Sequence, residues 1–257
     1  MEAGLVAVTK EWRERLAEGL ASLGLTLERE QAERFGRYLR YLLVENERVN
    51  LTAIVDPAEV AVKHFVDSAA VLTVLGGEGR SLVDVGSGAG FPGVPLAILR
   101  PDLQVTLVEA NQKKAGFLER LRTELDAENV RVVKGRAEEI GRQAEHRERY
   151  SVAVARAVAS LPVVWEYLLP LVEVGGLAVA LKGPAVVVEL ESGAWAARVL
   201  GGGDQSVQRF RLNEGVGERE IVWTRKVAAT PEAYPRRPGM PAKRPLQARE
   251  EKRGGGR

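Results

Sequence analysis

Four glycines lie close together after a short apolar run in the first half of the chain. Residues 83–93 read VDVGSGAGFPG, with glycines at positions 86, 88, 90 and 93. Glycine adopts a positive φ without steric cost and lets a ligand approach the backbone closely. In open α/β sheets, ligands bind at the carboxyl ends of the strands, where such a loop would lie. The pattern therefore predicts a binding loop for a nucleotide-like ligand, with Asp84 in the strand that precedes it.

The residues around this loop separate the possible ligand classes. A P-loop is excluded because no Gly-Lys-Ser/Thr follows the glycines. Residues 88–93 match the G-x-G-x-x-G pattern of dinucleotide-binding folds, and Glu109 closes the next strand at the distance expected for a ribose-binding acid. Pro92, however, stands where a pyrophosphate would need free helix N–H groups. An NAD-dependent oxidoreductase stays an alternative, although no Tyr-x-x-x-Lys or well-placed histidine offers a hydride-transfer site.

The residue composition excludes several kinds of chemistry. The 257-residue chain has no cysteine, and its two histidines are His64 and His146. Disulfides, thiolate zinc sites and thiol nucleophiles are therefore excluded, and we expect no metal. No apolar run approaches the ~18 residues that a membrane span requires, and no signal-like stretch begins the chain. We expect a cytoplasmic protein that does not bind membranes.

The basic residues are concentrated near the C-terminus. Residues 225–257 hold ten Lys/Arg against three Asp/Glu, a local charge of +7, which leaves 27 bases and 32 acids, or −5, elsewhere. Five prolines between positions 231 and 245 make regular structure improbable there and favour an extended chain, and we expect the terminal GGGR to be disordered. Such a segment suits an anionic partner such as nucleic acid, although a solubilising tail has the same composition.

The elements that position the glycine loop begin with helices. Apolar residues recur at helical spacing at positions 12, 16, 20 and 23, and again at positions 35, 39, 42 and 43. Gly24 can end the first helix, and Asp56 followed by Pro57 is typical of a further helix start. We expect these helices to cap the next domain, with a separate binding module as the alternative.

From residue 81 onwards, short β-branched runs alternate with helix-like segments. The predicted strands are residues 81–85, 104–109, 130–134, 150–155 and 177–181, followed by an antiparallel hairpin of residues 206–212 and 219–225. Alternating strands and helices imply a mainly parallel sheet covered on both faces. The fold class is therefore α/β, with an antiparallel edge hairpin and an N-terminal helical cap. We divide the chain into a cap at 1–78, an α/β domain at 79–228 and a basic tail at 229–257.

Several stretches, in order, resemble a known family. Asp84 through Gly90 resemble the first motif of class I S-adenosylmethionine-dependent methyltransferases, whose fold is Rossmann-like, and Glu109 resembles the acid at the end of their second strand. The chain is most similar to the bacterial 16S rRNA guanine-N7 methyltransferase G family, also called glucose-inhibited division protein B. The matching stretches are residues 49–52, 63–68, 86–93, 135–139, 155–160, 180–183 and 233–239. Glu220, where relatives often carry histidine, and the extension at 247–257 depart from the pattern.

The resemblance implies that S-adenosylmethionine is the cofactor and that it transfers a methyl group to 16S rRNA, in the 530 loop. The cofactor contacts that we expect are Asp84, Gly86, Gly88, Gly90, Phe91, Glu109, Ala110, Asn111, Ala137, Glu138 and Arg156. Phe91 is equally compatible with a core position. Arg156 could bind the methionine carboxylate, an RNA phosphate or a structural partner, and Arg156 and Lys182 are the candidate catalytic residues.

The methyl acceptor can also be approached by elimination. Methylation of a pyrimidine carbon needs a thiolate, which this chain lacks. Methylation of a base amine usually accompanies an Asn/Asp-Pro-Pro-aromatic turn, whereas residues 155–158 read ARAV. Oxygen acceptors need a positioned base, and none is evident. Guanine N7 needs no base because its lone pair is free, so direct displacement by N7 fits best.

Three further groups of residues have expected roles. His64 and Asp67 have the i, i+3 spacing of an acid–base pair, but such a pair more often orients a local turn. Asn50 is expected to bond backbone near the methionine end of the cofactor. In the tail, Arg236, Arg237, Lys243 and Arg244 are the expected rRNA-binding residues. We expect a monomer, and a non-enzymatic RNA-binding protein is the third candidate function.

Overall fold

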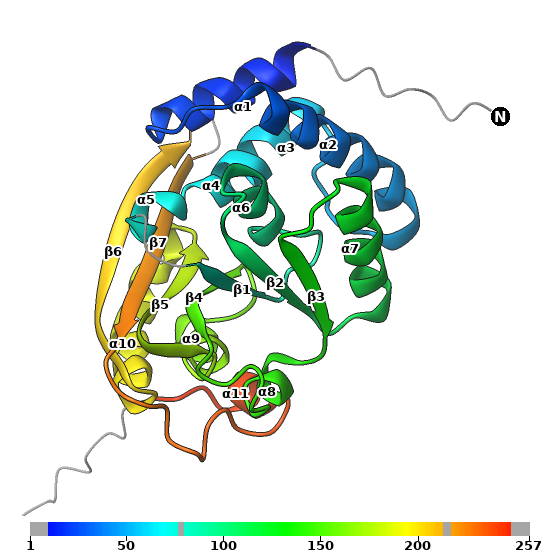
Figure 1. The fold of residues 1–257 in the computed structure, drawn as a ribbon. Coiled ribbons are helices and arrows are strands. Elements are labelled where there is room, and N and C mark those ends of the chain that lie inside the picture. Colours follow the sequence, from blue (N-terminus) through cyan, green and yellow to red (C-terminus); the bar gives the residue numbers. More distant parts are fainter. Residues whose placement is uncertain (1–9, 77–79, 213–216, 248–257) are drawn as a thin grey trace, which may run out of the picture.

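The computed structural model describes residues 10–76, 80–212 and 217–247, and its centre is a seven-stranded sheet of order β3-β2-β1-β4-β5-β7-β6 (Figure 1). The strands are β1 (Ser81–Val85), β2 (Gln104–Glu109), β3 (Val130–Lys134), β4 (Tyr150–Arg156), β5 (Val172–Lys182), β6 (Gly202–Leu212) and β7 (Gly217–Lys226). Strands β1 to β5 pair in parallel, and β7 pairs antiparallel with both β5 and β6. This confirms the predicted α/β class and the antiparallel edge hairpin.

Helices cover both faces of the sheet. They are α1 (Lys10–Ser22), α2 (Arg29–Val49), α3 (Pro57–Val60), the π-helix η1 (Ala61–Val66), α4 (Asp67–Ala69), α5 (Leu72–Leu75), α6 (Gly93–Leu99), α7 (Gln112–Glu124), α8 (Ala137–Ile140), α9 (Leu161–Leu168), the 3₁₀-helix η2 (Pro184–Glu189), α10 (Leu190–Val199) and α11 (Met240–Lys243). None of these described helices is long and apolar enough to cross a membrane.

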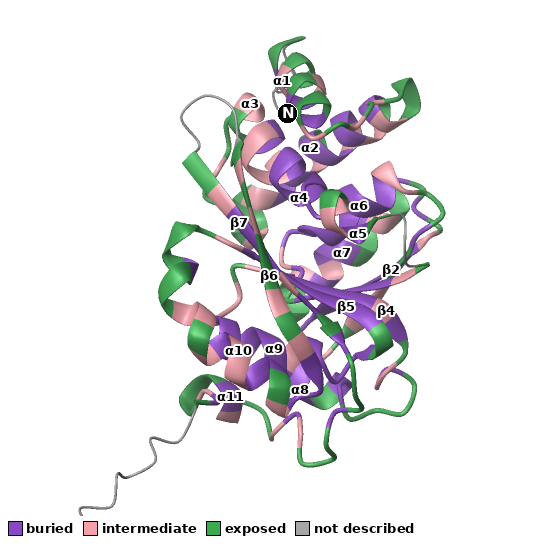
Figure 2. Cartoon of the chain, turned by 90° about the vertical axis from the view of Figure 1, so that its left-hand side faces the viewer, coloured by how far each residue is buried: buried purple, intermediate pink, exposed green. Residues whose placement is uncertain are grey.

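Two clusters of buried apolar side chains hold the layers together (Figure 2). The first joins the N-terminal helices, α6 and α7 to one face of the sheet, and the second joins α9 and α10 to the other face. The apolar stripe of α2 enters the first cluster through Phe35, Tyr38, Leu39 and Leu42, all with no exposed surface. The N-terminal helices therefore share a core with the sheet, and the proposed division at residue 78 stays a prediction.

The local signals placed the helix ends correctly. Gly24 has φ +74° just after α1, and the Asp56 carboxylate accepts the Glu59 N–H at 2.9 Å at the start of α3. The predicted start of the fifth strand is wrong: β5 begins at Val172 rather than at residue 177. The register shifts between Tyr150 and Val152, and a strand that is interrupted in this way does not show a continuous apolar pattern.

The tail is folded against the sheet domain, which its composition did not predict. Residues 240–243 form the short helix α11, which contains Pro241 in its first turn. Pro235, Pro241 and Leu246 are buried. The expectation of an extended segment is therefore wrong for residues 229–247, because two of the prolines themselves and Leu246 pack on the domain. The expected disorder of GGGR lies outside the described residues.

Candidate active site

The glycine loop lies where the strand order reverses. Since β1 is flanked by β2 and β4, the carboxyl ends of these three strands meet at the switch point where open α/β sheets bind ligands. The N–H groups of Gly86 and Ser87 donate to the Val108 carbonyl oxygen at 2.8 and 3.2 Å, which ties the loop to β2. The loop, the end of β2 and the end of β4 thus form one edge.

The glycines of this loop have different roles. Gly88 has φ +56°, and a Cβ there would meet no atom nearer than the Gly86 carbonyl oxygen at 3.8 Å. The space over Gly88 is therefore open to a ligand. A Cβ at Gly86 would lie 3.0 Å from Val158 Cγ2, so the loop after β4 lies beside the glycine loop.

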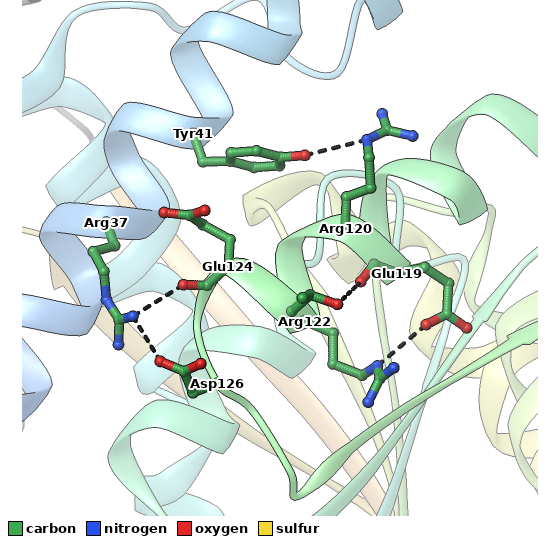
Figure 3. Close-up of a pocket in the computed structure, with 8 residues that line it drawn as sticks. Arg37, Tyr41, Glu119, Arg120, Arg122, Glu124 and Asp126 are labelled. Carbon is green, nitrogen blue, oxygen red and sulfur yellow. Dashed lines mark hydrogen bonds and ion pairs between the residues drawn. The ribbon is translucent and has the colours of Figure 1, made fainter.

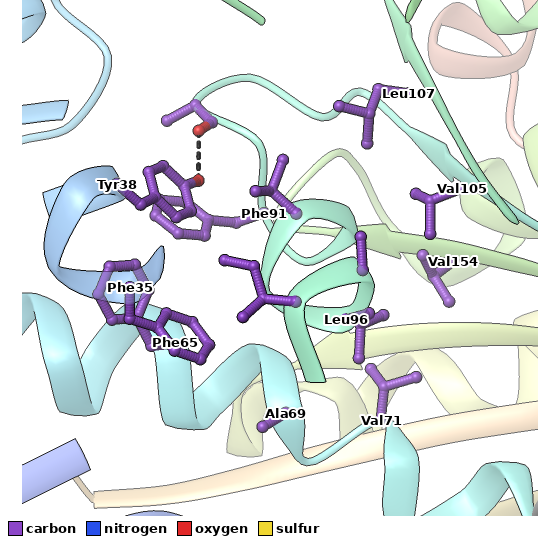
Figure 4. Packing of buried hydrophobic residues seen from close by; sticks show 14 of the residues in the cluster. Phe35, Tyr38, Phe65, Ala69, Val71, Phe91, Leu96, Val105, Leu107 and Val154 are labelled. Atoms are coloured by element: carbon purple, nitrogen blue, oxygen red, sulfur yellow. Dashed lines mark hydrogen bonds between the residues drawn. The ribbon is translucent and has the colours of Figure 1, made fainter. Parts of the chain in front are cut away.

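Gly90 instead makes room for a neighbouring helix. A Cβ there would lie 2.7 Å from the Tyr38 hydroxyl oxygen and 2.9 Å from Val94 Cγ2. The Tyr38 hydroxyl donates to the Ala89 carbonyl oxygen at 2.6 Å, as Figure 4 shows. Complete burial raises the pKa of Tyr38 well above its usual range, which keeps the hydroxyl a donor. The structure gives Gly90 a packing role, and its cofactor contact stays a prediction.

Glu109 connects the glycine loop to the loop between β2 and α7, at the carboxyl end of the sheet. Its side chain is buried and accepts the Gly88 N–H at 2.9 Å and the Asn111 N–H at 2.7 Å. Asn111 in turn caps α7, because its Oδ1 accepts the N–H groups of Lys113 and Lys114. Ala110 lies exposed between them. Each Glu109 oxygen keeps further acceptor capacity.

Asp84 is a buried acid beneath the loop. Its Oδ2 accepts the Gly93 N–H at 2.9 Å at the start of α6, whereas Oδ1 is buried without a hydrogen-bond partner among the described residues. Burial raises the pKa of Asp84 to about 7, although hydrogen bonds from Gly93 and Ser87 act to lower it. A Cβ at Gly93 would lie 2.8 Å from the Asp84 carboxylate, which explains the glycine at that position.

Ala137 and Glu138 lie in α8, next to the end of β3, and both are buried. The Glu138 carboxylate accepts the N–H of Gly239, in the tail, at 2.8 Å. Glu138, an expected cofactor contact, thus also holds the tail in place, and its position in the sequence did not indicate this partner.

Arg156 ends β4 with its guanidinium half-buried beside the glycine loop. Nη1 donates to Asp67 Oδ2 at 2.9 Å and to the Lys63 carbonyl oxygen at 3.3 Å. Nη2 lies 3.2 Å from His64 Nδ1, and the guanidinium lies over the Phe91 ring, 4.8 Å from its centroid. Within the described part of the chain, Nε has no hydrogen-bond partner and is not sealed from solvent.

His64 and Asp67 are not paired with each other. Both contact Arg156, so the acid–base pair suggested by their spacing is replaced by a shared arginine. Asp67 also lies 3.5 Å from Arg219 Nε. The His64 ring stacks on Phe91 with 4.5 Å between ring centroids, and Phe91 is 5 % exposed. Phe91 therefore packs in the core, and its contact with the cofactor stays a prediction.

Asn46, rather than Asn50, shapes the loop between α2 and α3. The Asn46 side chain accepts the N–H groups of Leu51 and Thr52 at 2.7 and 2.8 Å and donates to the Thr52 carbonyl oxygen. Asn50 is exposed and follows α2 with φ +52°, so Asn46 makes the backbone hydrogen bonds that were expected of Asn50, and a contact near the methionine end of the cofactor stays a prediction.

Lys182 lies at the end of β5, near Arg156. Its Nζ donates to the Ala159 carbonyl oxygen at 2.8 Å and forms an ion pair with Glu189 at 2.7 Å. It borders a pocket of about 410 Å³ at the ends of β4 and β5. The lining residues are Asp67, Arg156, Ala157, Leu181, Lys182, Gly183 and Arg219.

The four expected RNA-binding residues of the tail do not share one environment. Arg237, Lys243 and Arg244 are exposed. Arg236 is not: its Nε and Nη2 donate to the carboxylate of Glu166, at 2.9 and 2.6 Å, and its backbone N–H donates there at 2.8 Å. Glu166 has no exposed surface, so Arg236 is a structural residue that the charge pattern could not distinguish.

A larger pocket, of about 690 Å³, lies between α2 and α7 (Figure 3). Four of its charged side chains pair within the pocket, Arg37 with Asp126 and Arg122 with Glu119, and Arg120 pairs with Glu45. Tyr41 accepts from Arg120. The pocket contains none of the predicted site residues, and we do not assign it to the chemistry.

The comparisons with known proteins agree with this architecture. Two solved structures share the fold: an O-methyltransferase from Bacillus cereus (TM-score 0.54, 19% identity, 74% of this chain and 90% of that one) and a putative O-methyltransferase from Klebsiella pneumoniae (TM-score 0.51, 15% identity, 74% and 90%). At these identities they show the Rossmann-like methyltransferase fold alone.

Sequence relatives are far more similar. The ribosomal RNA small subunit methyltransferase G of Symbiobacterium thermophilum is 47% identical over 91% of this chain and 98% of its own length. That of Carboxydothermus hydrogenoformans is 45% identical over 90% and 99%. The family model of rRNA small subunit methyltransferase G matches residues 31–222, from α2 to β7, and so includes the glycine loop, Glu109 and Arg156. The chain therefore belongs to the rRNA small subunit methyltransferase G family, and it is an S-adenosylmethionine-dependent methyltransferase that acts on small-subunit rRNA.

Proposed function

We propose that this protein methylates N7 of a guanine in the 530 loop of 16S rRNA, with S-adenosylmethionine held over the glycine loop. The residues fit an adenosyl cofactor. The space over Gly88 is open, and the buried carboxylate of Glu109 can accept hydrogen bonds from ribose hydroxyls. Arg156, at the end of β4, has an Nε–H without a hydrogen-bond partner among the described residues. When bound, the cofactor supplies an electrophilic sulfonium methyl group.

The environment of the pocket beside Arg156 carries the assignment to N7. Its charged lining residues are Arg156, Lys182, Arg219 and Asp67, and Asp67 is already bonded to two of these arginines. Burial and the nearby Arg156 charge lower the pKa of His64 to about 3, so this imidazole is a poor base. Asp67 is the one carboxylate among the described residues that line this pocket, and it is already paired, so the pocket suits an acceptor that loses no proton, such as guanine N7.

The protein's own contribution is then orientation and electrostatics. Fixing two reactants in position can be worth roughly 7–11 kcal/mol of barrier. Arg156 is held by Asp67 and the Lys63 carbonyl, so its guanidinium is ordered before any ligand arrives. The exposed bases Arg237, Lys243 and Arg244 would contact rRNA phosphates. We infer that the protein acts as a monomer in the cytoplasm, where its rRNA substrate is made.

The proposal is tested by locating the methyl group. Small ribosomal subunits lacking this modification are incubated with the protein and radiolabelled S-adenosylmethionine, and 7-methylguanine is mapped by chemical strand cleavage. We expect one labelled guanine in the 530 loop. A label on an exocyclic amine, a ribose oxygen or another loop would contradict the assignment. Calorimetric titration with S-adenosylhomocysteine and with NADH separates the methyltransferase from an oxidoreductase.

A further inference from the structure

His64 is surrounded by groups that determine which of its ring nitrogens carries the proton. Nδ1 lies 3.2 Å from Arg156 Nη2 and 3.1 Å from the Lys63 carbonyl oxygen. Nε2 lies 2.8 Å from Thr52 Oγ1. These contacts conflict, because Lys63 would favour a proton on Nδ1 and Arg156 would favour a lone pair there.

Arg156 decides between the two forms. A guanidinium has only donors and keeps its charge, so Nδ1 must accept from Nη2 if the two are in contact. The Lys63 carbonyl oxygen has another donor, Nη1 of Arg156, at 3.3 Å. Thr52 Oγ1 accepts the Ile54 N–H at 3.0 Å and has a second lone pair for the Nε2–H of the histidine. The neutral ring with its proton on Nε2 therefore satisfies Arg156 and Thr52, and the Lys63 carbonyl oxygen has Arg156 Nη1 as its donor.

This arrangement leaves one edge of Arg156 for a ligand. Nη1 is used by Asp67 and Lys63, and one Nη2–H is used by His64, whereas Nε has no partner among the described residues. The same chain shows what such an edge binds: Arg100 and Arg236 each use Nε and Nη2 to hold a carboxylate, that of Asp102 and that of Glu166. An oxyanion with the geometry of a carboxylate or phosphate fits it.

We propose that His64 is a positioning residue: its Nδ1 and the ring stack on Phe91 fix the Arg156 guanidinium so that its Nε edge binds an oxyanion of the substrate or cofactor. Thr52 is a second positioning residue, because its Oγ1 accepts the hydrogen bond from the Nε2–H of His64 and so keeps the proton on that nitrogen. The inference rests on the proposed role of Arg156. It links the loop after α2, η1 and the end of β4 into one support for the ligand.

The test exploits the different reach of asparagine and glutamine. In His64→Asn the amide oxygen can take the place of Nδ1, whereas in His64→Gln the amide reaches the position of Nε2 and leaves Nη2 without its acceptor. Both variants lose the stack on Phe91. We expect His64→Gln to weaken binding or raise KM about tenfold, the scale for losing a hydrogen bond to a charged group, and His64→Asn to recover most of this loss. Thr52→Val should act in the same direction as His64→Gln, with Thr52→Ser as its conservative match.

Measurements with two cofactor analogues and with rRNA identify which oxyanion binds the Nε edge of Arg156. Binding of S-adenosylhomocysteine, which has a carboxylate, is compared with binding of 5′-methylthioadenosine, which lacks it, and KM for rRNA is measured in parallel. A defect confined to S-adenosylhomocysteine assigns the edge to the cofactor carboxylate, and a defect confined to KM for rRNA assigns it to a phosphate. His146→Gln, at the histidine bonded to Tyr150, is the matched control and should leave both unchanged.

A double-mutant cycle with Arg156→Lys then shows whether His64 acts through the arginine. We expect the double variant to be little worse than Arg156→Lys alone. Additive effects, or equal defects in His64→Asn and His64→Gln, would overturn the inference while leaving the role of Arg156 intact. No defect in Arg156→Lys in either assay would overturn both. Methyl transfer to guanine N7 by the wild-type protein is measured separately and does not depend on these outcomes.

Discussion

At the scale of single residues, the unpaired oxygen of Asp84 predicts a pH-dependent stability. The carboxyl group has a pKa of about 7 in the folded protein and 3.8 as its reference value, so between these values the folded state holds a proton that the unfolded state has lost. Stability therefore falls as pH rises from about 4 to about 7, by on the order of 4 kcal/mol at about 1.4 kcal/mol per unit. Asp84→Asn removes this loss.

The check is urea unfolding of the wild type and Asp84→Asn at pH 5 and pH 8. The amide oxygen can still accept the Gly93 N–H, so the fold is retained. The variant should gain stability relative to the wild type between the two pH values. A constant difference between the two proteins would show that Asp84 titrates normally.

Glu109 offers a second prediction at this scale. Glu109→Ala should weaken S-adenosylhomocysteine binding by roughly 1.5–3 kcal/mol, because hydrogen bonds to a charged group are lost. Glu109→Gln keeps one oxygen acceptor for the Gly88 or Asn111 N–H and should fall between the alanine variant and the wild type. Calorimetry measures both, and an unchanged dissociation constant in the alanine variant would reduce Glu109 to a loop support.

The role of Gly88 in cofactor binding is best tested with a small side chain. Gly88→Val should abolish cofactor binding, but φ +56° strains any L-residue there, so the valine variant also tests the backbone. Gly88→Ala, compared with the wild type in both unfolding and S-adenosylhomocysteine titration, separates the two effects. We expect binding to fall more than stability. Wild-type affinity in the folded alanine variant would place the ligand elsewhere.

At the scale of elements, helix α2 supports the glycine loop through Tyr38. Tyr38→Phe leaves the Ala89 carbonyl without its donor and should cost about 1–3 kcal/mol of stability. Gly90→Ala should be destabilising as well, because its Cβ would lie 2.7 Å from the same hydroxyl. Urea unfolding of the two single variants and the double variant tests the contact. Because Tyr38→Phe removes the clashing oxygen, the double variant should lose less than the sum, and strict additivity would contradict the packing role.

The sequence predicted these elements best where the signal is local. The glycine loop and its flanking strands, the stripe of α2 and the Asp56 cap are patterns within a few residues, and each was found at its predicted place. The support of the loop was not predictable in this way. Tyr38 and Ala89 are 51 residues apart, and a buried tyrosine in a helical stripe has the same spacing whether or not its hydroxyl has a partner.

At the scale of the whole molecule, the tail has a structural part and an exposed part. Arg236→Ala leaves the fully buried Glu166 without its arginine and should cost about 3–5 kcal/mol of stability. The triple variant Arg237→Ala, Lys243→Ala and Arg244→Ala should unfold like the wild type, but with a higher KM for rRNA and a weaker salt dependence. Thermal unfolding and methylation across a salt series measure the two effects.

An unchanged KM in the triple variant would direct the search for RNA contacts to the N-terminal helices. The composition of the tail predicted the same rRNA-binding role for Arg236 as for Arg237, Lys243 and Arg244, and it could not distinguish the structural arginine from the exposed basic residues. A run of basic residues shows that positive charge is abundant. It does not show which basic residue is paired with an acidic residue far away in the sequence, as Arg236 is with Glu166, 70 residues away. Such pairings depend on the assembled fold.

The strand order has a consequence for how the protein is made. Strand β5 pairs on one side with β4, but its other partner is β7, which is synthesised only after η2, α10 and β6. During translation, the parallel sheet can therefore assemble while its β5 edge still has open backbone N–H and C=O groups. Edges of this kind recruit strands from other chains. Nascent protein that stalls before β7 should be a target for chaperones, whereas protein that has completed β7 should not.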